Sequence, residues 1–65
     1  MNWDEIAADW KQFEGKVQQR WGKLTHDDLQ HVKGELKGLA GKIQERYAIT
    51  KEEAERQIHE WRSKL

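Results

Sequence analysis

The segment Trp10-Lys-Gln-Phe-Glu-Gly-Lys-Val-Gln-Gln-Arg-Trp21 is repeated without gaps as Leu36-Lys-Gly-Leu-Ala-Gly-Lys-Ile-Gln-Glu-Arg-Tyr47. The copies share Lys, Gly, Lys, Gln and Arg at matching positions, and after one deleted residue Leu24-Thr25 matches Ile49-Thr50. Apolar residues recur in both copies at helical spacing. Repeated units of this size pack together because neither can bury its apolar face alone. The repeat therefore predicts two helical hairpins in tandem.

Capping signals divide the chain into helices. A short polar residue stands three positions before an acidic one at Asn2, Thr25 and Thr50, a spacing typical of helix starts. Gly22 and Gly34 are expected helix stops, because glycine readily adopts the left-handed conformation found after a helix. We therefore expect four helices, at about residues 3–21, 26–33, 35–47 and 51–64.

The middle of the chain leaves two arrangements open. Apolar residues from Leu29 to Tyr47 also fit one continuous helix that begins after Thr25. Such a helix would be about 33 Å long, whereas a globule of this size has a radius of gyration of only about 11 Å. Gly34 offers a break. We expect an all-α fold of four short-to-medium helices in two packed hairpins, with a three-helix bundle as the alternative.

Four tryptophans supply much of the material for a core. A chain of 65 residues has room for a single core, so we expect one domain over residues 1–65. Each indole ring can bury about 150–250 Å², and Trp3, nearest a terminus, is the candidate to lie off the main apolar stripes. Gly15 and Gly41 occupy matching places inside two helices, where we expect them to permit close helix crossing.

Composition excludes several classes of protein. The chain has no cysteine, so it has neither a disulfide framework nor a thiolate zinc site. No apolar run approaches the ~20 residues that a membrane span requires, and the first residues are acidic where a signal peptide would be basic. We therefore expect a cytoplasmic protein without a membrane anchor. Its net charge of zero predicts no general attraction to nucleic acid or anionic lipid.

Three phrases in order, Trp10-Lys-Gln-Phe-Glu-Gly-Lys-Val, Trp21-Gly-Lys-Leu-Thr-His-Asp-Asp and Gly41-Lys-Ile-Gln-Glu-Arg-Tyr47, strongly resemble the CsbD-like family of small bacterial stress-response proteins. The resemblance covers nearly the whole chain. It implies a bacterial cytoplasmic protein, induced under general stress, with two packed hairpins similar to SAM-like domains. The family has no established catalytic activity or ligand, so the resemblance assigns no functional residues. This chain differs from the more glycine-rich members by its four tryptophans.

Two short patterns invite a functional reading that the residues do not support. Gly22-Lys-Leu-Thr25 superficially resembles a phosphate-binding loop, but a leucine separates its Lys from its Thr and no strand is expected before it. His26, Asp27, Asp28 and His31 lie within two helical turns, yet the helix dipole alone favours acidic residues there. With no Ser-His-Asp or Cys-His set either, we expect no enzyme and no catalytic, cofactor-binding or metal-binding residues.

Basic residues of the two repeats could form a surface for nucleic acid. The candidates are Lys16, Arg20, Lys23, Lys37, Lys42 and Arg46. The helices run from acidic to basic, however, which complements the helix dipole and requires no partner. We expect a monomeric, non-catalytic stress-response protein that binds another macromolecule, possible partners being proteins, or acts as an abundant hydrophilic protectant. A DNA- or RNA-binding helical domain is the alternative.

Overall fold

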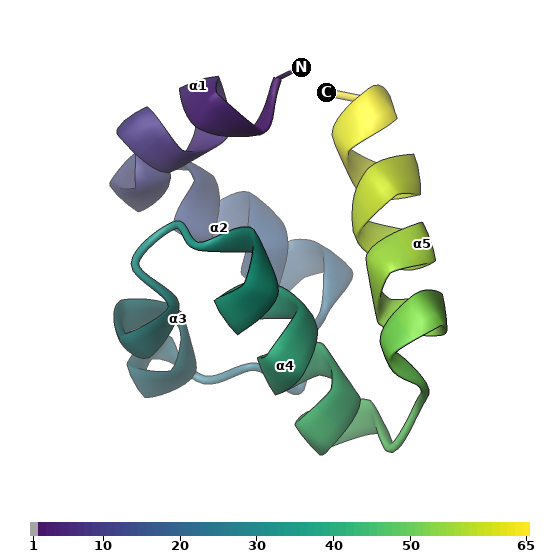
Figure 1. The fold of residues 1–65 in the computed structure, drawn as a ribbon. Coiled ribbons are helices and arrows are strands. Elements are labelled where there is room, and N and C mark those ends of the chain that lie inside the picture. The colour runs from purple at the N-terminus through teal and green to yellow at the C-terminus, as the bar shows by residue number, and fades with distance from the viewer. Residues whose placement is uncertain (1) are drawn as a thin grey trace.

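Helix α4 lies at the centre of the fold, packed against both α3 and α5. The computed structural model describes residues 2–65, which contain five helices and no strand. In chain order they are α1 (Trp3–Ala8), α2 (Trp10–Arg20), α3 (His26–Val32), α4 (Leu36–Tyr47) and α5 (Lys51–Ser63) (Figure 1). The all-helical prediction is confirmed. None of these helices in residues 2–65 has the length and apolar character needed to cross a bilayer.

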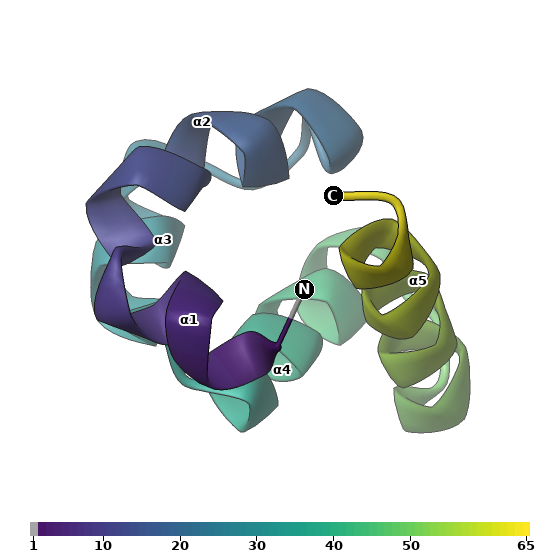
Figure 2. The ribbon, with the colours of Figure 1, turned by 90° about the horizontal axis from the view of Figure 1, so that it is seen from above.

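The first predicted helix is divided in two at Asp9, so the chain has five helices where four were expected. Asp9 leaves the helical conformation at φ −123° and ψ 44°. An unbroken helix over residues 3–21 would span about 27 Å, the full length of the longest axis of the molecule, 27 Å. The break turns α1 back over the molecule (Figure 2). Trp3 then packs against Trp10, with ring centroids 6.2 Å apart, and its indole N–H donates to the carbonyl of Gly34 at 2.9 Å.

A left-handed turn separates α3 from α4, which rules out the single long helix. Lys33 and Gly34 have φ values of +51° and +82°, and successive residues of that kind cannot continue a right-handed helix. The glycine is required here for a second reason. A Cβ atom at position 34 would lie 3.1 Å from the Cα of Ala7. The predicted break at Gly34 is confirmed.

Capping side chains start three helices where the sequence places them. Asn2 accepts from the backbone of Asp4 at 3.3 Å, and Thr50 accepts from the backbone of Glu53 at 3.1 Å. At Thr25 the exchange is reciprocal: its hydroxyl accepts from the Asp28 N–H, and the Asp28 carboxylate accepts from the Thr25 N–H. These bonds satisfy backbone donors that a helix start otherwise leaves unpaired.

Tryptophan rings join the two repeats in one core. Trp21 is fully buried and meets Trp61 edge to face, with centroids 5.5 Å apart. Its indole N–H donates to the side-chain oxygen of Gln57 at 3.0 Å, while the Trp10 N–H donates to the Leu29 carbonyl at 3.0 Å. The buried apolar residues are Ile6, Trp10, Phe13, Val17, Trp21, Leu24, Leu29, Val32, Leu39, Ala40, Ile43, Ala54, Ile58 and Trp61. Trp3 packs against this core only partly buried, as expected.

The expectation that Gly15 and Gly41 permit close helix crossing is wrong. A Cβ atom built on either residue meets nothing within 4 Å, apart from the helix's own nearby backbone. Both residues are exposed. They therefore carry the cost of glycine in a helix without a packing reason.

Replacing Gly15 with alanine should stabilise the protein. Glycine inside a helix costs about 1 kcal/mol relative to alanine, so Gly15→Ala should raise the melting temperature by about 4–8 °C in a domain of this size. Thermal unfolding followed by circular dichroism measures the shift. Gly34→Ala is the opposite control and should lower the melting temperature, because of the positive φ and the contact with Ala7. A lower melting temperature for Gly15→Ala would contradict the packing described above.

Candidate functional site

The charged residues of the repeats form two distinct sites, one buried and one open. The buried site centres on Asp28, the one charged side chain of residues 2–65 that is buried, at 4 % exposure. Arg46 of α4 donates to both carboxylate oxygens, from Nε to Oδ2 and from Nη2 to Oδ1, each at 3.0 Å. The Nζ atom of Lys42 lies 3.7 Å from Oδ1. The cluster holds α3 against α4.

Hydrogen bonds to the charged form determine how Asp28 titrates. The Arg46 guanidinium, first, and the backbone N–H of Thr25, second, hold the pKa of the Asp28 carboxyl well below its ordinary value of 3.8, against the opposing effect of burial. The same ion pair raises the pKa of Arg46 above its ordinary value. Both groups keep their charges at any ordinary pH. Their mutual pairing indicates a structural role.

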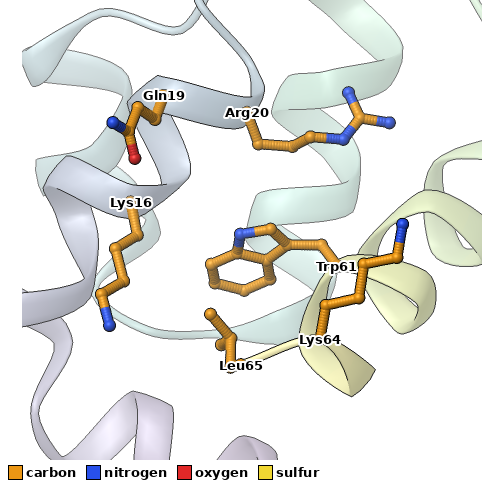
Figure 3. Close-up of a pocket in the computed structure, with 6 residues that line it drawn as sticks. All are labelled: Lys16, Gln19, Arg20, Trp61, Lys64 and Leu65. Carbon is orange, nitrogen blue, oxygen red and sulfur yellow. The ribbon is translucent and has the colours of Figure 1, made fainter.

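The open site is a hollow of about 530 Å³ between α2 and the end of α5. Figure 3 shows the indole ring of Trp61 lying between Arg20 and Leu65. The hollow is lined by Lys16, Gln19, Arg20, Trp61, Lys64 and Leu65. Three of these side chains are cationic and none is a carboxylate. Trp61 and Leu65 supply an apolar wall.

The segment from Gly22 to Thr25, which superficially resembles a phosphate-binding loop, makes contacts that stabilise the fold. The Thr25 hydroxyl caps α3, and the backbone N–H of Lys23 donates to the Tyr47 hydroxyl at 3.1 Å. The ammonium group of Lys23 lies 5.1 Å from the centre of the Tyr47 ring. These contacts join the end of one repeat to the end of the other.

The histidines do not come together with the acidic residues near them in sequence. Asp28 is held by Arg46, and the ring of His26 lies 3.4 Å from the side-chain nitrogen of Gln30. The Nδ1 atom of His59 lies 2.9 Å from Arg62. Within residues 2–65, no three His, Asp or Glu side chains are placed to hold a metal ion.

The six basic residues proposed for a nucleic-acid surface are divided by the fold. Lys42 and Arg46 turn towards Asp28, whereas Lys16 and Arg20 line the open hollow. Sequence reasoning identified these residues but missed both arrangements. A pair such as Asp28 and Arg46, on different helices, leaves no signal in a single sequence, and the hollow depends on where α5 ends relative to α2.

Comparison with known proteins agrees with the resemblance seen in the sequence. The family model described as CsbD-like matches residues 4–56. The UPF0337 protein YjbJ of Escherichia coli K12 is 48 % identical over 64 residues, covering 98 % of this chain and 93 % of its own. The UPF0337 protein PA4738 of Pseudomonas aeruginosa is 48 % identical over 65 residues, the full length of both chains.

Neutralising Asp28 should destabilise the fold. Asp28→Asn weakens charge-assisted hydrogen bonds of the kind that contribute about 1.5–3 kcal/mol, so the free energy of unfolding should fall by about that amount. Urea denaturation at neutral pH measures it. Asp27→Asn, in the same helical turn but exposed, is the matched control and should cost less than about 1 kcal/mol. Equal losses in the two variants would show that the Asp28 cluster adds nothing to stability.

Stability should also fall in acid, by an amount that depends on Asp28. The folded-state pKa of Asp28 is depressed, so its contribution is fully present above about pH 4. It is lost as pH falls from there through the folded-state pKa, because the unfolded chain takes up the proton first. Glu53 adds to the effect, because Arg56 and then Gln57 lower its pKa from 4.5 to about 2. Denaturation at pH 7 and about pH 3 should show a smaller loss for Asp28→Asn than for the parent.

Proposed function

Because the chain belongs to the CsbD-like family, we propose that it is a non-catalytic protein of the bacterial general stress response that protects other macromolecules. In this proposal it works in the cytoplasm as an abundant, folded and highly charged solute. The single observation that carries the proposal is the surface: the one large hydrophobic side chain exposed within residues 2–65 is Leu65, at 41 %.

The surface supports protection better than docking to another protein. A docking module exposes a contiguous apolar patch of several hundred Å², and one exposed leucine does not provide it. Charged side chains of both signs cover the outside instead. On α5, Arg56 lies between Glu53 and Glu60, at 2.6 and 3.1 Å, and Lys64 pairs with Glu60 at 3.6 Å. Interspersed charges of both signs leave no large field of one sign that would attract one particular partner.

The titratable groups support a non-catalytic role. Enzyme active sites shift the pKa values of groups that face a pocket. Here the groups with shifted pKa values are Asp28, Arg46, Glu53 and Arg56. Each belongs to an ion pair within the protein. Ion pairing within the protein therefore accounts for these pKa shifts, and no catalytic role is needed to explain them.

A freeze–thaw assay tests the proposal. A labile enzyme such as lactate dehydrogenase is cycled with increasing molar excess of this protein, and its retained activity should rise gradually with the excess. The triple variant Lys51→Gln, Glu52→Gln, Glu55→Gln removes exposed charges from α5 and should protect less. Serum albumin at equal mass is the external reference.

The controls separate protection from specific binding. Gly15→Ala leaves every charge in place, so it should protect as well as the parent. Protection that saturates at equal molar amounts would contradict the proposal, because it indicates a stoichiometric complex. Protection no better than buffer, at concentrations where albumin protects, would also overturn it.

A further inference from the structure

The helix break at Asp9 differs in kind from the matching break in the second repeat. Asp9 aligns with Glu35, and each of the two residues stands directly before a long helix. The turn before Glu35 contains Lys33 and Gly34, both with positive φ, which cannot continue a right-handed helix. Asp9 has a φ of −123°, and residues 3–14 contain neither glycine nor proline. The local sequence therefore requires the second break but not the first.

The residues on both sides of Asp9 favour one continuous helix. Apolar residues keep their helical spacing through the break, at Trp3, Ile6, Trp10 and Phe13. Within residues 2–65 the Asp9 side chain makes no capping hydrogen bond at the start of α2, although such bonds start α1, α3 and α5. The N–H of Gln12 donates to the Asp9 carbonyl at 3.0 Å, a three-residue spacing. Straightening at Asp9 would replace it with the four-residue spacing of an α-helix.

Contacts with residues distant in sequence hold α1 in its folded-back place. The Trp3 indole N–H donates to the Gly34 carbonyl at 2.9 Å, and the Trp3 ring lies 6.2 Å from that of Trp10. Ile6 is fully buried, and the Cα of Ala7 lies 3.1 Å from where a Cβ on Gly34 would stand. Figure 2 shows α1 leaving the line of α2 to reach this place. A second copy of the chain carries the same α1 and fits the same surface.

We propose that two copies of this chain exchange their α1 segments and form a domain-swapped dimer. Each chain straightens at Asp9 into one helix over about residues 3–20. Its Trp3 then donates to the carbonyl of Gly34 of the partner subunit. Exchange of an identical segment repeats the contacts of the monomer and is therefore a low-cost route to a dimer. The dimer gains the continuous helix, once in each chain.

Asp9 opposes the exchange and keeps the monomer as the form at low concentration. Aspartate is less favourable than alanine inside a helix. In the dimer the two Asp9 residues lie near the two-fold axis, because each α1 docks beside the break of the other chain, and their like charges repel. In the monomer α1 docks at an effective concentration on the order of 1 mM, so exchange requires comparable protein concentrations. The exchange does not depend on the protective role proposed above.

A concentration series tests for the dimer. The protein is held at concentrations rising to about 1 mM, just below its melting temperature so that α1 can detach, and is then cooled. Size-exclusion chromatography with light scattering measures the mass. We expect a monomer in dilute samples and a dimer fraction that grows with concentration. Parent and Asp9→Ala chains that both stay monomeric throughout the series would overturn the proposal.

Two substitutions at Asp9 separate helix continuation from loss of charge. Asp9→Ala and Asp9→Gly both remove the carboxylate, and both residues can adopt the φ of −123° found in the monomer. Glycine is less favourable than alanine inside a helix by about fivefold in equilibrium constant, so the two breaks of a dimer give about 25-fold. Asp9→Ala should therefore dimerise about 25-fold more tightly than Asp9→Gly. Equal dimerisation of the two variants would overturn the proposal, because a continuous helix would not then drive it.

NMR with mixed labels distinguishes exchange from a dimer formed between outer surfaces. ¹³C-labelled and unlabelled Asp9→Ala chains are mixed, warmed and cooled, and the dimer is isolated. Isotope-filtered spectra should show contacts between the Trp3 ring of one chain and the Trp10 ring of the other. A dimer in which this contact stays within one chain would overturn the proposal. So would a straightened monomer in which the Trp3 indole N–H is released to water.

Discussion

Burial of indole rings, three of which have a hydrogen-bond acceptor for the N–H group, is the constraint on which the fold depends. A chain of this length buries few side chains, so each tryptophan is a large share of the core. A buried N–H group without an acceptor would cancel part of that gain. Trp21 reaches Gln57 in the other repeat, and Trp10 reaches the backbone of Leu29. These two hydrogen bonds determine which faces of the helices pack against one another, which burial of apolar area alone would not specify.

Local features of the fold could be read from the sequence because they depend on neighbouring residues. Thr25 and Thr50 start helices where their capping positions predict, and Gly34 ends the α3 region because of its backbone conformation. The break at Asp9 could not be read in this way. It carries no proline or glycine, and it follows from the fit of Trp3 over a distant turn. The apolar spacing on either side continues as if the helix were unbroken.

The candidate sites show the same division between local and distant information. The capping role of Asp28 follows from its distance to Thr25 in the sequence, whereas its pairing with Arg46 requires the packing of α3 on α4. The repeat identifies Lys16 and Arg20 in the sequence, because they occupy the positions of Lys42 and Arg46. What differs between the two pairs is the position of an acid on another helix. The aligned repeats look alike at these positions. The alignment does not show that Lys42 and Arg46 pair with Asp28, whereas Lys16 and Arg20 have no such acidic partner among the described residues.

The hydrogen bond from Trp3 to Gly34 affects how the amino-terminal helix unfolds. Chain ends ordinarily fray first, since few contacts hold them. Here the short α1 is tied to the carbonyl of the left-handed turn between the two repeats, 31 residues away. Release of α1 would expose Ala7 and loosen the turn it covers. Release of the amino end is thereby coupled to loosening of the turn between the repeats.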